Sequence, residues 1–136
     1  MKKNRLGKSG LTVGEIGLGC MSLGTEEASA IALVHEALDR GVTLLDTADL
    51  YDGGRNEEIV GKAIRGRRDR VVLATKAGNR AIPGKEGWTW DPSKKYILSA
   101  VKESLRRLGT DYLDLYQLHG GTIDDPIDET IEAFEL

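Results

Sequence analysis

The sequence predicts a parallel α/β fold, in which short strands alternate with amphipathic helices. Two observations predict it. Helical hydrophobic periodicity appears four times along the 136 residues, each time after a short apolar segment, and glycine or proline marks most of the boundaries. Strands that are each followed by a helix pair in parallel, with right-handed crossovers and with helices covering the sheet. The residues therefore indicate half of a (β/α)8 barrel or most of a doubly wound sheet.

An N-terminal β-hairpin is expected over residues 5–13, because Gly7 and Gly10 enclose a small turn between two β-prone pieces. The first strand of the alternation is expected over residues 15–19, where a short apolar segment ends at Gly19.

The first helix is expected over residues 26–40, with Thr25 as its cap and Gly41 at its end. One face of this helix is apolar, which indicates the side that packs on the sheet. The residues on this face are Ala30, Ile31, Val34, Ala37 and Leu38.

The second unit is predicted as a strand over residues 42–46 and a helix over residues 55–64, closed by Gly66. An apolar strand follows over residues 70–76, and a long loop containing glycines separates it from the next helix. The apolar positions of the second helix are Ile59, Val60, Ala63 and Ile64.

The third helix is expected to begin with Asp91 as its cap and Pro92 at its first position, and to end at Gly109. Its apolar face consists of Ile97, Leu98, Val101, Leu105 and Leu108. A strand over residues 112–118 opens the fourth unit, and Asp125-Pro126 is expected to open the fourth helix. That helical pattern is still running at Leu136, so residues 1–136 are expected to be the N-terminal half of one barrel domain, cut within its fourth helix.

Composition excludes several classes of partner. Nineteen basic and 22 acidic residues give a net charge of −3, which provides no overall attraction to nucleic acid or to an anionic membrane. The single cysteine, Cys20, cannot form an internal disulfide, and the N-terminus lacks the apolar core of a secretory signal. No apolar run approaches the ~20 residues of a membrane span. A cytoplasmic protein without a metal site is expected.

Reactive side chains close three successive strands. Asp46, Lys76 and His119 end the second, third and fourth strands, at the carboxyl ends where barrel enzymes keep their active sites. Neighbouring strands lie about 4.8 Å apart, so inward-pointing side chains at equivalent heights come within mutual reach. A buried lysine needs an anion, and Asp46 on the adjacent strand is available.

Tyr51 follows Asp46 by five residues, in a polar turn before the second helix. A phenol has an unperturbed pKa near 10, and the positive charge of Lys76 would lower it. His119 could orient a carbonyl oxygen or relay a proton to it. Taken singly, each residue also has a structural interpretation: polar residues are common at strand ends and tyrosines in loops, and strand-end histidines are often only hydrogen-bonded.

Three motifs carry a family resemblance. Asp46-Thr-Ala-Asp-Leu-Tyr51 with the following Asp-Gly-Gly-Arg-Asn-Glu57 resembles the aldo-keto reductase signature, Ala74-Thr-Lys76 resembles the family's third-strand lysine motif, and residues 111–119 resemble its fourth-strand histidine motif. The resemblance covers essentially the whole chain. It implies a TIM-type (β/α)8 barrel, of which this chain holds the first four βα units, preceded by an N-terminal β-hairpin that plugs the barrel bottom.

The same resemblance implies NADPH-dependent reduction of aldehydes or ketones to alcohols. Tyr51 would be the general acid, Lys76 would lower its pKa, Asp46 would anchor Lys76, and His119 would orient the carbonyl substrate. Hydride would come from the reduced nicotinamide. NADPH in place of NADH is inferred from the resemblance alone, and the family contributes most of its other cofactor-binding residues from the second half of the barrel.

The resemblance also assigns binding residues. Gly19, Cys20 and Met21, together with Asp46, match positions that touch the nicotinamide and its ribose, although packing explains Cys20 and Met21 equally well. Gly17-Leu-Gly19 does not complete a dinucleotide fingerprint, because Ser22 stands in place of its third glycine.

Tryptophans in the long loop after the third strand are candidates for the substrate pocket. Trp88 is expected to line it with Tyr51 and His119, the alternative being that it covers a helix. One departure from the family pattern concerns Tyr51, because Asp52 replaces the glycine that usually follows this tyrosine.

Two non-enzymatic alternatives stay open: a regulatory subunit related to the reductases, and an autonomous half-barrel. The half-barrel would have two unpaired sheet edges, which favours self-association. On the enzyme hypothesis, the isolated 136 residues are expected to have little or no activity without a second half.

Overall fold

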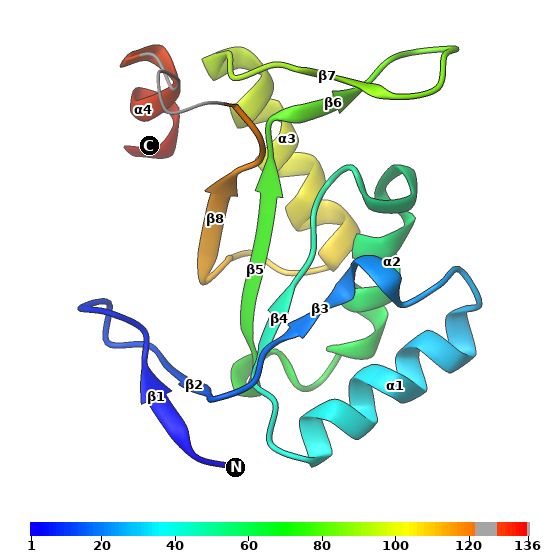
Figure 1. Ribbon diagram of the computed structural model, residues 1–136, viewed down its shortest axis with the longest axis vertical. Coiled ribbons are helices and arrows are strands. Elements are labelled where there is room, and N and C mark those ends of the chain that lie inside the picture. Colours follow the sequence, from blue (N-terminus) through cyan, green and yellow to red (C-terminus); the bar gives the residue numbers. More distant parts are fainter. Residues whose placement is uncertain (122–127, 136) are drawn as a thin grey trace.

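The parallel strands expected from the sequence form one sheet, in the order β3-β4-β5-β8 (Figure 1). The structure is a computed structural model that describes residues 1–121 and 128–135. The strands are β3 (Leu18–Gly19), β4 (Leu44–Asp46), β5 (Val72–Ala77) and β8 (Leu115–Leu118), and every adjacent pair is parallel. The predicted parallel pairing is therefore confirmed.

The helices α1 (Glu27–Asp39), α2 (Arg55–Ala63) and α3 (Lys94–Leu108) lie on one side of this sheet (Figure 1). The helix α4 (Asp128–Glu135) packs against α3. A continuous apolar core fills the space between the sheet and the first helices. Its buried members are Cys20, Val34, Leu38, Val42, Leu45, Val60, Ala63, Ile64, Val71, Leu73 and Leu108.

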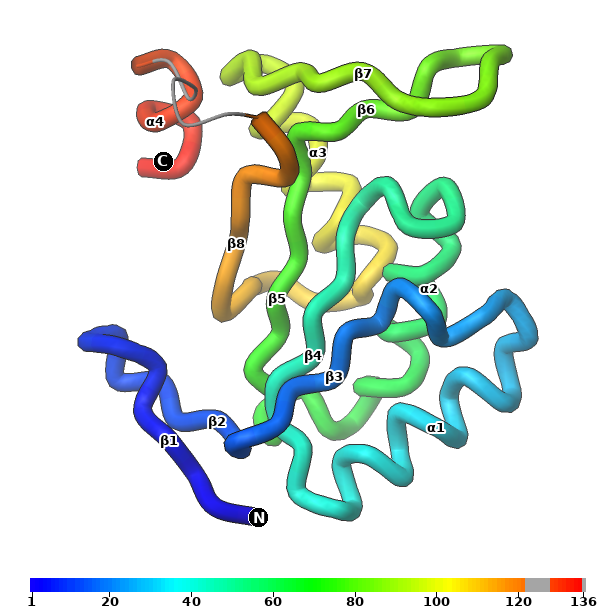
Figure 2. The backbone as a smooth tube through the Cα atoms, in the orientation of Figure 1, coloured from blue at the N-terminus to red at the C-terminus, as the bar shows by residue number. Residues whose placement is uncertain are grey.

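Two antiparallel hairpins lie at opposite ends of the parallel strands (Figure 2). The strands β1 (Lys3–Arg5) and β2 (Thr12–Gly14) form the predicted N-terminal hairpin, near the amino ends of the sheet strands. The second hairpin, β6 (Asn79–Ala81) with β7 (Trp88–Trp90), follows β5 directly and was not predicted. It brings both tryptophans to the carboxyl end of the sheet.

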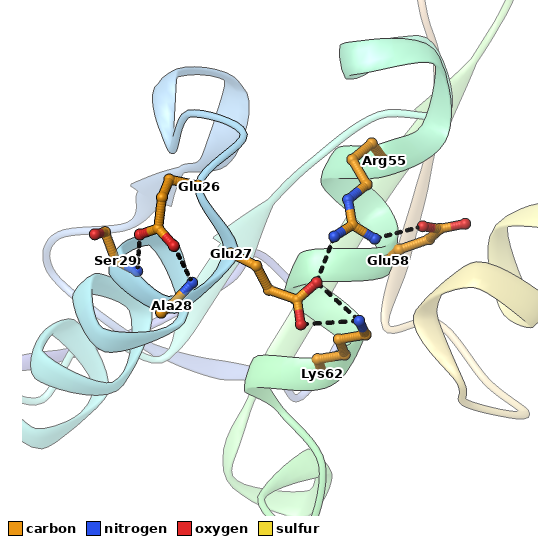
Figure 3. A network of polar contacts seen from close by, with 7 residues as sticks. All are labelled: Glu26, Glu27, Ala28, Ser29, Arg55, Glu58 and Lys62. Atoms are coloured by element: carbon orange, nitrogen blue, oxygen red, sulfur yellow. Dashed lines mark hydrogen bonds and ion pairs between the residues drawn. The ribbon is translucent and has the colours of Figure 1, made fainter.

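The predicted caps of two helices are wrong by one or two residues. The side chain of Glu26, and not that of Thr25, caps α1 by accepting hydrogen bonds from the backbone N–H groups of Ala28 and Ser29 (Figure 3). In α3 the cap is Ser93, whose hydroxyl accepts from the backbone of Tyr96. Each helix starts later than predicted because a polar residue closer to its first turn reaches the free N–H groups.

Asp91, the predicted cap of α3, instead accepts a hydrogen bond from the backbone N–H of Ser93. The predicted start of the fourth helix at Asp125-Pro126 lies outside the described residues. Three short 3-10 turns complete the secondary structure: η1 (Cys20–Ser22), η2 (Tyr51–Gly54) and η3 (Arg68–Arg70). Within the described part of the chain, none of the helices has the length and apolar character to cross a bilayer.

A network of ion pairs fastens α1 to α2 (Figure 3). The carboxylate of Glu27 accepts from Lys62 at 2.8 and 2.9 Å and also from Arg55, which donates to Glu58 at 2.9 Å. Exposed pairs of this kind contribute only about 0–1 kcal/mol each. The network nevertheless restrains the side chain of Arg55, the first residue of α2.

Candidate active site

Asp46 and Lys76 form the central ion pair of the carboxyl end of the sheet. The ammonium Nζ of Lys76 donates to both carboxylate oxygens of Asp46, at 2.9 and 2.8 Å, and to the backbone carbonyl of Thr47 at 2.8 Å. The side chain of Lys76 is only 12% exposed, whereas that of Asp46 is 40% exposed. An ammonium group carries three hydrogens, so each of them has an acceptor here.

The strand register staggers these side chains. Asp46 lies opposite Ala74 of β5, whereas Lys76 lies opposite Gln117 of β8. The expectation of equivalent heights is therefore wrong: Lys76 stands two residues beyond the partner of Asp46, and His119 stands two residues beyond Gln117. Strands in a barrel are tilted and staggered, so side chains from different registers meet around the axis.

Tyr51 completes the cluster from the turn that follows β4. Its ring lies edge-on to the ring of His119, with centroids 6.0 Å apart and an interplanar angle of 86°. The Nζ of Lys76 lies 5.1 Å from the centroid of the Tyr51 ring. The turn is tied to β5, because the N–H of Asp49 donates to the carbonyl of Lys76 at 3.1 Å. Tyr51, Lys76, Asp46 and His119 are thus brought together.

The residues after Tyr51 reverse the chain into α2. Asp52 has φ 50° and ψ 38°, in the left-handed region, and Gly53 and Gly54 also have positive φ values. Asp52 thereby adopts the backbone conformation that a glycine adopts most readily. Gly54 is required for a second reason, since a Cβ at this position would lie 2.9 Å from the Cδ of Arg107.

His119 is held at the end of β8 by a close approach of backbones. Its N–H donates to the carbonyl of Ala77 at 2.8 Å, and a Cβ on Gly78 would lie 2.5 Å from the carbonyl oxygen of His119. Burial lowers the pKa of His119, and the positive charge of Lys76 lowers it further. Both effects favour the neutral form of the imidazole. Its Nδ1 is buried without a partner among the described residues.

Gln117 belongs to the site and was missed in the sequence. Its side-chain Nε2 donates to Oδ1 of Asp46 at 3.2 Å. The sequence did contain one indication of this role: residues 117 and 119 are two positions apart, and side chains at this spacing on a strand point to the same face.

Two further buried polar residues, Asn56 and Glu57, support the site from the start of α2. Asn56 accepts from the hydroxyl of Thr47 and donates to the carbonyl of Cys20, each at 2.7 Å. Glu57 is fully buried and accepts from Thr75 and from Arg107, each at 2.7 Å. Both residues stand in the signature segment, so their presence was visible in the sequence but their role was not.

The predicted cofactor residues differ in accessibility. Gly19 is exposed, with no atom within 4 Å of a built Cβ, and Met21 is 63% exposed. Cys20 is fully buried, and its burial raises the pKa of the thiol to about 12. Cys20 therefore packs in the core, as its alternative interpretation proposed, and a cofactor contact at this position stays a prediction.

The two tryptophans occupy different environments. Trp88 is 62% exposed and lies opposite Ala81 in the β6–β7 hairpin. Trp90 packs against the loop that follows His119, where a Cβ on Gly121 would lie 2.5 Å from the indole ring. Trp90 is thus the tryptophan in contact with the histidine loop.

Comparison with known proteins decides the family. The sequence profile described as the aldo/keto reductase family matches residues 15–136. The chain belongs to this family. Its parallel sheet with helices on one side accordingly represents part of an aldo-keto reductase barrel, and the doubly wound alternative is set aside.

Individual relatives support this family assignment. The chain is 67% identical over 135 residues to the uncharacterized oxidoreductase YqkF of Bacillus subtilis, covering 99% of the chain and 44% of the relative. It superposes on the holo form of aldo-keto reductase AKR11C1 from Bacillus halodurans with a TM-score of 0.94 and 67% identity, covering 99% of the chain and 45% of that structure.

An aldo-keto reductase from Klebsiella pneumoniae in complex with NADPH is 42% identical, with a TM-score of 0.77, and the match covers 93% of the chain and 42% of that structure. The chain therefore spans less than half the length of these aldo-keto reductase relatives.

Proposed function

We propose that the complete protein carrying this chain reduces aldehyde or ketone carbonyls to alcohols with NADPH, and that Tyr51 is the general acid. The observation that carries this proposal is the meeting of Tyr51, Lys76 and His119 at the carboxyl end of the sheet, with Lys76 held by Asp46. Barrel enzymes assemble their active sites at this end, from residues of several strands.

Each of the four side chains has a distinct task in this proposal. The Tyr51 hydroxyl donates a proton to the carbonyl oxygen of the substrate, and the charge of Lys76 beside the ring stabilises the phenolate that remains. Asp46 neutralises and orients Lys76, which is largely buried. The neutral His119 donates a ring N–H to the same carbonyl oxygen and thereby fixes the orientation of the substrate.

The residues around the site fit a nicotinamide cofactor, which would supply the hydride for the carbonyl carbon when bound. The open surface at Gly19 leaves room for a flat ring, and the exposed Met21 offers an apolar contact beside it. Asp46 faces the same end of the sheet, because Gly19 and Asp46 are register partners. NADPH is proposed as the cofactor, because the Klebsiella relative was determined in complex with it.

Trp88 is proposed as an apolar wall for the substrate, since its exposed indole leaves a hydrophobic surface at this end of the molecule. The substrate is a small carbonyl compound, and neither nucleic acid nor a membrane is proposed as a partner. A cytoplasmic location stays a prediction.

The activity is proposed for a chain of the relatives' length, in which residues 1–136 form the N-terminal half of one barrel domain. The described residues provide the proton-transfer group, and the relatives are more than twice as long. The isolated 136 residues should therefore give no turnover with NADPH. Measurable turnover by this chain alone would refute that part of the proposal.

Tyr51→Phe in the complete protein tests the general acid. Loss of the hydroxyl should lower kcat for an aromatic aldehyde by about 10²–10⁴-fold, the usual contribution of general acid catalysis. The matched control is Tyr112→Phe, because Tyr112 is 45% exposed and its ring stacks with Arg68 away from the site. Equal activity of the wild type and Tyr51→Phe would overturn the assignment.

A further inference from the structure

Gln117 makes a side-chain contact that spans three strands. It stands in β8, whereas the carboxylate that accepts its hydrogen bond belongs to Asp46 in β4, and β5 lies between them. Gln117 is also the register partner of Lys76. The amide therefore reaches across the strand that carries Lys76 to the carboxylate of Asp46.

Gln117 donates to a carboxylate oxygen of Asp46 that also accepts from Lys76. Oδ1 of Asp46 accepts from Lys76 at 2.9 Å and from Gln117 at 3.2 Å, whereas Oδ2 accepts from Lys76 at 2.8 Å. A carboxylate held by one ammonium group alone can rotate and exchange one of its oxygens for water, and Asp46 is 40% exposed. A second donor, on strand β8, restricts that rotation.

The chemistry of an amide suits this task. A cation at position 117 would compete with Lys76 for the carboxylate, and an anion would repel Asp46 and compete for Lys76. The amide of Gln117 donates a hydrogen bond without changing the net charge of the cluster. The charge of Lys76 beside Tyr51 is therefore left to be balanced by Asp46 alone.

We propose that Gln117 is a positioning residue of this site, which locks the Asp46 carboxylate so that both of its oxygens stay on Lys76 and the ammonium group stays beside Tyr51. This inference rests on the proposed reductase function for its kinetic consequence, but not for its geometric one. Gln117 acts through Asp46 and Lys76 and needs no contact with substrate or cofactor.

The test uses Gln117→Met and Gln117→Glu in the complete protein. Methionine has a similar length and no donor, so kcat should fall about tenfold while KM for the aldehyde and for NADPH stays within about twofold. The introduced carboxyl group of Gln117→Glu should lower kcat further at pH 8, and activity should recover toward pH 5 as this group is protonated.

Tyr116→Phe is the matched control. The hydroxyl of Tyr116, on the same strand, contacts the carbonyl of Ile97 in α3 and not the ion pair. Its kcat and pH profile should equal those of the wild type. If residues of β8 had only a structural role, Tyr116→Phe and Gln117→Met would lower kcat to a similar extent. In that case the activity of Gln117→Glu would not recover at low pH.

A crystal structure of Gln117→Met separates this inference from the proposed function. The Asp46 carboxylate should be rotated, with one oxygen withdrawn from Lys76 beyond hydrogen-bond distance. An unchanged two-oxygen contact together with wild-type kcat would overturn the positioning role. Failure of the reductase function itself would instead appear as a wild-type protein that reduces no carbonyl, and the crystal structure would still decide the role of Gln117.

Discussion

Lys76 and Asp46 are joined through both carboxylate oxygens, and the third hydrogen of the ammonium group is taken by the carbonyl of Thr47. The Nζ of Lys76 lies 5.1 Å from the centroid of the Tyr51 ring, and in the proposed mechanism Lys76 acts on Tyr51 through its charge. A charge effect of this kind survives small shifts of the ring, whereas it is lost completely when the ammonium group is removed.

Lys76→Met should lower kcat by about 10²-fold or more, because Tyr51 loses the cation that stabilises its phenolate. Folding stability should change less than activity, since Asp46 is 40% exposed and can be solvated. Steady-state kinetics and denaturant unfolding of the complete protein measure the two effects. Lys62→Met, which removes an exposed lysine from the α1–α2 network, is the control and should keep full activity. A stable Lys76→Met protein with wild-type kcat would exclude the proposed role.

Glu57→Ala should lower the free energy of unfolding by about 3–5 kcal/mol, the cost of breaking a buried ion pair by removing one partner. Glu57 is fully buried, and the side chain of Arg107 that donates to it is only 15% exposed. Urea unfolding of the complete protein measures the change. Glu58→Ala, next in sequence, removes only an exposed partner of Arg55 and should cost less than about 1 kcal/mol. Similar losses for both variants would contradict the assignment of Glu57 as a buried anchor.

Asp46, Lys76 and His119 could be predicted to lie together because strand topology alone determines which strand ends are neighbours. Parallel strands bring their carboxyl ends to one edge, so the sequence alone predicts that Asp46, Lys76 and His119 meet there. Gln117 was not predicted, because a glutamine side chain is neither titratable nor nucleophilic and nothing in its chemistry marks it as a site residue. Its hydrogen bond to Asp46 crosses the intervening strand β5, and hydrophobic periodicity does not show which side chains reach across a strand.

Other features depended on distances that a sequence does not contain. The stagger between Asp46 and Lys76 follows from the strand register, which one residue of slip would change. The burial of Cys20 follows from the packing of α1 and α2 against β3. From the sequence alone, the segment around Cys20 is equally compatible with an exposed loop. The β6–β7 hairpin lies in a region rich in glycine, which the sequence marks as a turn without saying that its flanks pair.

Asp52→Gly should raise the free energy of unfolding by about 0.5–1 kcal/mol, because Asp52 occupies a left-handed conformation that costs a residue with a Cβ more than it costs glycine. The gain is reduced by the larger entropy of glycine in the unfolded chain. Asp52→Val is the opposing variant and should be destabilising, because a β-branched residue tolerates positive φ poorly. Thermal unfolding measures both. Activity of Asp52→Gly should stay within about twofold of the wild type, since the backbone that presents Tyr51 is preserved. A loss of stability would contradict this account.

The buried carboxyl of Asp49 makes folding depend on pH. Burial raises the pKa of Asp49 to about 6, although the hydrogen bond from the Tyr96 hydroxyl, at 2.8 Å, opposes the rise. The unfolded value is about 3.9, so the neutral form is favoured in the fold. Its contribution to stability is complete below about pH 4 and is lost as the pH rises through about 6.

Asp49→Asn stays neutral at every pH and keeps an oxygen that can accept from Tyr96. Relative to the wild type, its free energy of unfolding should therefore increase as the pH rises from 4.5 to about 6, between the unfolded and folded pKa values of Asp49, and should level off toward pH 7.5. Urea unfolding at steps of pH measures the difference, and Asp69→Asn at an exposed position should follow the wild-type curve in parallel. A constant difference between Asp49→Asn and the wild type across this range would show that the Asp49 carboxyl titrates alike in the folded and unfolded chains, and that its burial beside Tyr96 has no energetic consequence.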